Sequence, residues 1–384
     1  MTRRQPIRFS GVHAFTKELF EDDLHAKRVY SIANAALGVV LSSSLAIHAI
    51  GAGLAAARGL KKKHAVKQVD RLLSNAGVDV WALFEHWVPF VVGARTDIVA
   101  ALDWTEHYHD DHSTIALNMI TSHGRATPLM WSTVVKSEMA GQRNEHEDAL
   151  LERLREVLPK GVRITILADR GFGDQKLYDL MARLDFDYVV RFREIIMVTD
   201  AKGESRTAGE WVPPAGRALM IKGATVTQDQ TAVPAVVVVQ DPAMKEAWCL
   251  VTSRSDLTAR PVVKLYGKRF TIEENFRDSK DIHFGMGLSA THIGDTDRRD
   301  RLLLLSAMAV ALLTLLGAAG ESLGFDRWLK VNTSKKRTHS LFRQGQDYYM
   351  LIPTMKEEEF LPLVERFQQL LAGQSVFREV FGIL

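Results

Sequence analysis

The chain has 384 residues, of which 46% are hydrophobic and 25% are charged. These values are typical of a folded protein with two or three domains, and they exclude global disorder and a fibrous repeat. The formal net charge is only +3, so any affinity for nucleic acid must come from local clusters of basic residues. A single cysteine, Cys249, excludes an intramolecular disulfide and favours a reducing, cytoplasmic setting. The polar start MTRRQPIRFS lacks the apolar segment of a signal peptide.

Residues 1–95 are expected to form a helical DNA-binding region. The sequence predicts two helices joined around Gly51–Gly53, in a helix-turn-helix-like unit with a basic second half. Between Arg58 and Arg71 there are six basic residues and one acidic residue, Asp70. A solvated helix face would explain this charge run equally well. The candidates for DNA contact are Lys61, Lys62, Lys63, Lys67 and Arg71.

Residues 96–194 show the pattern of an alternating α/β core. Short apolar runs at 97–104, 113–120 and 126–135 predict three strands in a meander. A helix at about 145–158, a buried-type strand at 162–169, a second helix at about 174–184 and a strand at 187–193 follow. This is the element order of a ribonuclease H-like fold, a mixed sheet flanked by helices.

The rest of the chain is expected to interrupt and then complete this core. Residues 195–253 contain strand-like runs with prolines in their connections, which indicates a β-rich insertion. The core resumes in residues 254–324, with a long helix at about 261–280 and an apolar helix at 302–317. Residues 325–384 carry a basic stretch and then an acidic amphipathic helix around 356–372, and they are a candidate for dimerisation.

Two apolar stretches raise the question of a membrane span. Residues 302–317 reach the required length of about 20 residues only with the small residues that follow. Residues 29–57 are interrupted by Asn34, by a serine run and by His48. We therefore expect both stretches to be buried helices, and we expect no membrane association.

Two aspartates follow apolar runs. Asp103 ends the run IVAAL, and Asp169 ends the run ITILA. A carboxylate at the end of a buried strand suits a ligand of Mg²⁺, which prefers oxygen donors. Two such carboxylates on neighbouring strands can hold ions on either side of a phosphodiester. Taken alone, an aspartate at a strand end is more often a turn former or a helix cap.

A third acidic residue lies within the segment LYGKRFTIEENFRDSK. Tyr266, Arg269, Glu273 and Lys280 lie at offsets of 3, 7 and 14, so one helix would carry all four within about 60° of its circumference. A carboxylate for metal beside cations for phosphate is what DNA cleavage needs. On composition alone, a salt-bridged surface helix is the simpler explanation.

The spacing of these four residues resembles the Tyr-Arg-Glu-Lys (YREK) signature of bacterial insertion-sequence DDE transposases. The two preceding aspartates and the β-rich insertion are also similar to that family, over roughly residues 58–320. Asp169-Arg170 resembles the start of the family's second motif, although Gly171 stands where some members have Glu.

The resemblance implies a catalytic centre in which Asp103, Asp169 and Glu273 hold two Mg²⁺ or Mn²⁺ ions. It implies cut-and-paste chemistry on double-stranded DNA, through a hairpin intermediate at the transposon ends and then strand transfer into target DNA. A homodimer bridging two ends is the expected assembly.

The resemblance also implies DNA contacts around this centre. The expected phosphate contacts are Arg191, Tyr266, Arg269 and Lys280. Trp248 would stack on a flipped base, whereas an ordinary buried tryptophan would need no DNA to explain it.

Several further hypotheses stay open. His107, His109 and His112, with two neighbouring aspartates, imitate a metal cluster, but a solvated turn is favoured. A catalytically silent transposase-derived DNA-binding protein or inhibitor would keep the fold without the reaction. A nuclease would hydrolyse DNA without joining strands, and a membrane protein is the remaining hypothesis.

Overall fold

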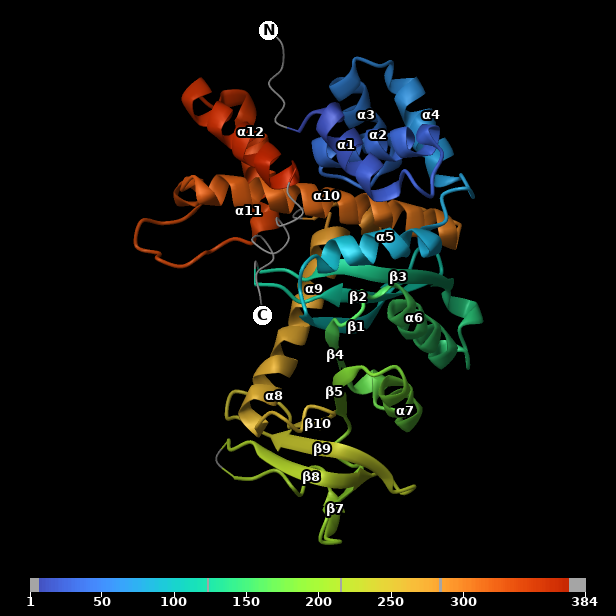
Figure 1. Cartoon of the computed structure of the whole chain (residues 1–384), viewed down its shortest axis with the longest axis vertical. Coiled ribbons are helices and arrows are strands. Elements are labelled where there is room, and N and C mark those ends of the chain that lie inside the picture. Colours follow the sequence, from blue (N-terminus) through green and yellow to red (C-terminus); the bar gives the residue numbers. More distant parts are fainter. Residues whose placement is uncertain (1–6, 123, 215, 283–284, 373–384) are drawn as a thin grey trace.

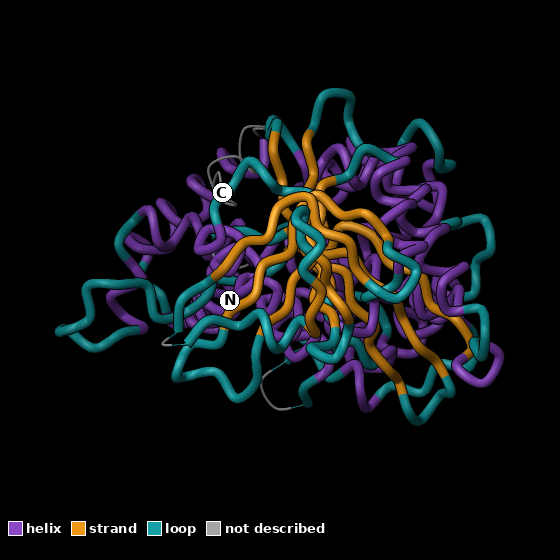
Figure 2. Tube along the Cα trace, turned by 90° about the horizontal axis from the view of Figure 1, so that it is seen from below, coloured by secondary structure: helices purple, strands orange, loops and turns teal. Residues whose placement is uncertain are grey.

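A computed structural model describes residues 7–122, 124–214, 216–282 and 285–372. Figure 1 shows a central sheet, with the N-terminal helices and the C-terminal helices gathered near one end of the molecule. The strands twist through the centre and helices surround them (Figure 2). The mixed α/β architecture with helical regions at both ends of the chain is therefore confirmed.

The N-terminal region is helical, as expected. Its helices are α1 (Phe9–Phe20), α2 (Ala26–Ser42), α3 (Ile47–Arg58), α4 (Lys62–Leu73) and α5 (Val80–Val92). The predicted joint around Gly51–Gly53 was wrong, because both glycines lie inside α3, and the chain turns instead at Gly59, whose φ is +65°. A Cβ on Gly51 would lie 2.7 Å from the Cα of Val66, and a Cβ on Gly53 would lie 2.7 Å from the carbonyl oxygen of Gly38. These glycines therefore allow close helix packing rather than a turn.

The α/β core follows in the expected order. Its elements are β1 (Asp97–His107), β2 (His112–Met119), β3 (Thr127–Val135), α6 (Arg143–Val157), β4 (Arg163–Ala168), α7 (Gln175–Arg183) and β5 (Asp187–Phe192). The strands lie in the order β3-β2-β1-β4-β5, with β1, β2 and β3 antiparallel and with β4 and β5 parallel to β1. This arrangement is consistent with a ribonuclease H-like transposase fold.

The strands predicted between residues 195 and 253 extend the same sheet. They are β6 (Met197–Thr199), β7 (Ser205–Thr207), β8 (Leu219–Val226), β9 (Thr231–Val239) and β10 (Trp248–Thr252). β10 pairs antiparallel with β5, and the order continues as β10-β9-β8-β6-β7. Across the described residues, ten strands thus join in one mixed sheet.

The two faces of the sheet are covered by different helices. Alternate residues of a strand point to opposite faces. In β1, Ile98 and Leu102 belong to the large core that also includes α5, α6 and α7, whereas Val99 and Ala101 pack in a second core with Val262 and Tyr266. The second core therefore places α8 (Ala259–Gly267) over the other face.

The long helix predicted at 261–280 is broken. α8 ends at Gly267, a 3-10 turn covers Lys268–Phe270, and α9 (Thr271–Lys280) follows. Glycine is a poor helix former, which weakens the helix where it breaks. The 3-10 turn winds these three residues more tightly, at about 3.0 residues per turn, and Arg269 within it still bonds Glu273 of α9.

The C-terminal helices are organised around α10 (Thr296–Ser322). It packs against α2, α4, α5, β3, α11 (Leu341–Leu351) and α12 (Glu357–Ala372). Within the described chain, α10 is the one helix long and apolar enough to cross a membrane, and the α2–α3 pair, bent by 99°, passes the same test only when taken together. The apolar stretch of α10 is 89% buried in the protein, as a core helix would be.

Candidate active site

Asp103 and Asp169 lie side by side at the end of a parallel ladder. The ladder between β1 and β4 ends with Leu102 opposite Ala168, so the next residue of each chain segment is an aspartate. Ala101 and Leu167 point into the core beneath α8, and alternation directs the two aspartates to that same face. The sequence predicted that Asp103 ends its strand. β1 instead continues to His107, so Asp103 lies within the strand.

Arg269 connects the third carboxylate to the first. Its guanidinium donates to Asp103 Oδ2 at 3.0 Å and to Glu273 Oε1 at 2.7 Å. The Arg269 side chain is 7% exposed and that of Glu273 is 52% exposed. Glu273 therefore points toward the aspartates, at the open rim of a site whose centre is a buried cation.

The pKa of Asp103, one of the three carboxylates, is shifted by its surroundings. Burial raises the pKa of Asp103 to about 6; the positive charge of Arg269 opposes this shift, and the negative charges of Asp169 and Glu273 add to it. The three carboxylates thus interact with one another across a partly dry site. A bound cation would therefore stabilise the ionised form of these carboxylates.

The donor set fits a divalent cation in kind. Three carboxylates provide the oxygen ligands that Mg²⁺ and Mn²⁺ prefer. Among the described residues, no three Asp, Glu, His or Cys side chains are gathered tightly enough to surround one ion. The carboxylates instead lie around Arg269, and Asp169 Oδ1 accepts from Gly171 N–H at 2.7 Å and caps the short turn Arg170–Phe172.

Tyr266 and Trp248 form an aromatic floor beside Arg269. Tyr266 is 1% exposed, and burial raises its pKa to about 12. The ring of Trp248, at the start of β10, meets Tyr266 edge-on at 5.0 Å and Phe270 at 6.0 Å. Trp248 is half-buried and Phe270 is 43% exposed, so this floor reaches the surface.

Arg191, on β5, and Lys280, at the end of α9, are further cations predicted for the site. Arg191 bonds Glu246 Oε1 at 2.8 Å and the carbonyl of Ala247 at 3.1 Å, and its side chain is 15% exposed. Lys280 donates to the carbonyl of Glu106 in β1. Burial, together with the positive charge of Arg299, lowers the pKa of Lys280 to about 8.

A family comparison agrees with this geometry. The model of a family described as the transposase DDE domain matches residues 99–312, which is more than half of the chain and includes all three carboxylates. The chain belongs to the transposase DDE domain family. DDE transposases act on DNA and use divalent metal ions. No curated protein matches the chain.

The basic candidates of the N-terminal region in this transposase domain protein are all at the surface. Lys61 precedes α4, and Lys62, Lys63, Lys67 and Arg71 lie on it; all five are exposed. The buried face of α4 is made by Ala65, Val69, Leu72 and Leu73. α4 therefore presents a basic outer face with an apolar inner face.

The solvated turn predicted after β1 is present at residues 108–111, where His109 and Asp111 are exposed, but His107 and His112 lie on β1 and β2 and are buried. His107 is 7% exposed, and its Nε2 lies 3.1 Å from Thr114 Oγ1. His112 is 2% exposed and accepts from Arg299 Nε at 3.0 Å, and Asp110 forms an ion pair with Arg299. Arg299 could not be predicted to make these contacts, because the charged segment DRRDR stands beside an apolar helix and looks like a solvated helix start.

Proposed function

We propose that the chain is a cut-and-paste transposase of the YREK type that cleaves DNA at the ends of its element and transfers the freed 3′-OH to target DNA. The observation that supports this most strongly is the meeting of Asp103, Asp169 and Glu273 around Arg269. Their spacing in the sequence matches the signature, and their side chains approach one another from three separate elements. A bacterial insertion-sequence origin and a cytoplasmic location belong to the same proposal.

Asp103, Asp169 and Glu273 are the residues that would hold Mg²⁺ or Mn²⁺. Two bound ions would supply activation of the attacking water or 3′-OH and stabilisation of the leaving oxygen. Asp103 carries the raised pKa, about 6, so at neutral pH it is mainly ionised and available as a ligand. Before metal binds, the single positive charge of Arg269 offsets part of the negative charge of Asp103 and Glu273, which stabilises the three carboxylates in the folded chain.

The chain's own cations would position the DNA. Lys280, on the same helix as Glu273, and Arg191, on β5, would bind end phosphates through charge-assisted bonds. Arg269 lies between Asp103 and Glu273, and the buried side chain of Tyr266 lies close to its guanidinium. Trp248, with Phe270 beside it, is the platform for an extruded base, a contact worth about 1–3 kcal/mol.

The N-terminal region would bind the end sequence, and two chains would bridge two ends. The exposed cations Lys61, Lys62, Lys63, Lys67 and Arg71 are the proposed contacts in this region. The proposed division is a DNA-binding region (1–95), a core in two parts (96–194 and 254–324) around an insertion (195–253), and a C-terminal region (325–384). A dimer follows from the chemistry, because excision requires both ends.

The direct test uses a supercoiled plasmid that carries the element's ends. With Mg²⁺, the wild-type chain should excise the element, pass through hairpin ends and form strand-transfer joints. Asp103→Asn, Asp169→Asn and Glu273→Gln should reduce cleavage below detection, because each removes a charged ligand, while binding of end DNA changes little.

Each of the other outcomes would identify a different activity for this chain. End binding by the wild type without excision would identify a silent DNA-binding descendant. Hydrolysis without hairpins or joints would identify a nuclease. Loss of end binding in all three variants would mean that the carboxylates hold the fold rather than the reaction.

A further inference from the structure

A basic hollow lies beside α8, away from the carboxylates. It encloses about 580 Å³ between α8, the start of β1 and the segment after β10. Arg254, Arg260, Lys264 and Lys268 line it, and Asp97 is the acidic residue among its lining residues. We call Arg260, Lys264 and Lys268 the α8 stripe, because they recur every fourth residue along α8 and the turn that follows it, and all three line this hollow.

The charges of the α8 stripe are not compensated. No acidic residue occurs between Leu257 and Ile272. In the described part of the chain, no ion pair links any member of the stripe to an acid, whereas in the next helix Arg277 pairs with Glu274. Burial lowers the pKa of Lys268, and repulsion from Lys264 lowers it further. A merely solvated helix face usually carries acidic partners at these spacings.

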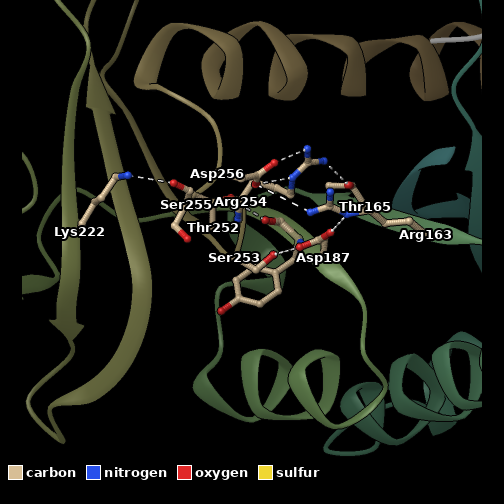
Figure 3. A network of polar contacts seen from close by, with 10 residues as sticks. Arg163, Thr165, Asp187, Lys222, Thr252, Ser253, Arg254, Ser255 and Asp256 are labelled. Carbon is tan, nitrogen blue, oxygen red and sulfur yellow. Dashed lines mark hydrogen bonds and ion pairs between the residues drawn. The ribbon is translucent and has the colours of Figure 1, made fainter. Parts of the chain in front are cut away.

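The wall of the hollow opposite the stripe is rigid. Arg254 is 9% exposed, and its guanidinium is held by both carboxylate oxygens of Asp256 at 2.9 and 3.0 Å and by Thr165 Oγ1 at 3.1 Å. Figure 3 shows this network, which also joins Arg163 to Asp187 between neighbouring strands. The hollow is thus a preformed feature at one end of the central strands.

The stripe leads toward the carboxylates. Lys268 immediately precedes Arg269, which binds Asp103 and Glu273, whereas Arg260 lies at the other end of α8. Asp97, in the wall, lies six residues before Asp103 in β1, which is about 20 Å at roughly 3.3 Å per residue. A DNA strand advances about 3.4 Å per nucleotide, so this distance corresponds to roughly six base pairs.

We propose that the α8 stripe binds the phosphate backbone of DNA up to roughly six base pairs from the cleaved bond. This rests on the proposed function, since it takes the carboxylates as the point of cleavage. The contact is to the backbone and carries no base specificity, because lysine and arginine on an open helix face meet phosphates first.

The test measures how DNA affinity depends on salt in the full-length chain. Arg260→Gln/Lys264→Gln is compared with Lys160→Gln/Lys202→Gln, which removes the same charge from exposed positions elsewhere. The slope of log affinity against log salt should fall by about 0.9 for each phosphate that is no longer bound, close to 2 for the stripe variant. The control should keep the wild-type slope.

Two duplexes identify which DNA is bound. One ends at the cleavage point, and the other continues into flanking DNA. A reduced slope with both duplexes places the stripe on the element's own end, and a reduced slope with the extended duplex alone places it on the flank. If neither slope differs from that of the control, the proposal is overturned.

A second measurement does not depend on substitutions. Bound DNA should protect Lys264 and Lys268 of the wild-type chain from acetylation, read by mass spectrometry, while Lys160 stays reactive. Equal reactivity of Lys264 and Lys268 with and without DNA would contradict the binding of DNA by the α8 stripe. If the stripe responds but the wild type never cleaves an end, the proposed function fails, and only the contact between the stripe and the DNA backbone stands, without its distance from a cleaved bond. If the wild type cleaves but the slope is unchanged, the proposed function stands and the stripe fails.

Discussion

Arg269 changes how the carboxylate site is understood at the scale of single residues. The resemblance to the YREK signature implied that this arginine contacts phosphate. In the structure it is buried between Asp103 and Glu273 and acts first as their counter-charge. The positions of the aspartates were predictable, since apolar runs end at them. The bridging role was not, because it depends on a contact across 166 residues of sequence.

Lys280 should make DNA binding depend on pH. Its pKa is lowered to about 8, so the fraction of charged Lys280 falls as pH rises through that value. Affinity for end DNA should then decrease by at most about tenfold per pH unit, the limit for one linked proton. Fluorescence anisotropy of a labelled end duplex, at constant ionic strength, measures this decrease.

Lys280→Arg is the matched variant. Arginine stays protonated up to about pH 12, so the variant should keep its affinity where the wild type loses it. Superimposable pH profiles for the two proteins would show that Lys280 does not contact phosphate.

The break between α8 and α9 shows what periodicity misses at the scale of elements. Offsets of 3, 7 and 14 predict one face only if the helix is continuous. The 3-10 turn Lys268–Phe270 lies between Tyr266, which is buried in the second core, and Glu273, which reaches the rim, and Arg269 within the turn bonds Glu273. The constituent helices were foreseeable from apolar spacing. The turn was not, because a glycine costs only about 1 kcal/mol in a helix and does not by itself dictate a break.

The close crossing of α3 and α4 should be sensitive to a single methyl group. A Cβ on Gly51 would meet the backbone of Val66 at 2.7 Å, which a rotamer change cannot relieve. Gly51→Ala should therefore destabilise the protein by about 1–3 kcal/mol, the usual cost of overpacking. Urea unfolding followed by circular dichroism measures this difference.

Gly294→Ala serves as the control for that experiment. Nothing lies within 4 Å of its added Cβ, and the residue is exposed. The control should unfold like the wild type. Equal stability of Gly51→Ala and Gly294→Ala would mean that α3 and α4 are not packed as closely as described.

At the scale of the whole molecule, local and non-local features differ in how far the sequence reveals them. The order of strands and helices from residue 97 to 193 was predictable, because each element shows its own apolar pattern. The pairing of β10 with β5, which turns an expected insertion into an extension of the sheet, was not. Strand pairing depends on partners far apart in the chain, and neither strand carries a mark of the other.

Bridging of two ends should appear in the mass of the DNA complex. Light scattering of the chain with end duplex should give two chains and two duplexes, about twice the mass of a one-to-one complex. A scrambled duplex of the same length is the control and should not give the paired mass. A stable one-to-one complex that still excises the element would contradict the dimer.

The first turns of α10 form hydrogen bonds both to the N-terminal helices and to the sheet. Arg298 and Arg301 bond α4 and the loop after it, and Asp300 bonds Thr133 in β3. If α4 reads the end sequence and the sheet carries the cutting site, this part of α10 acts as a fixed ruler between reading and cutting. The number of base pairs from the recognised sequence to the cut should then tolerate no change. Inserting about five base pairs, half a helical turn, should abolish cleavage while leaving recognition of the end intact.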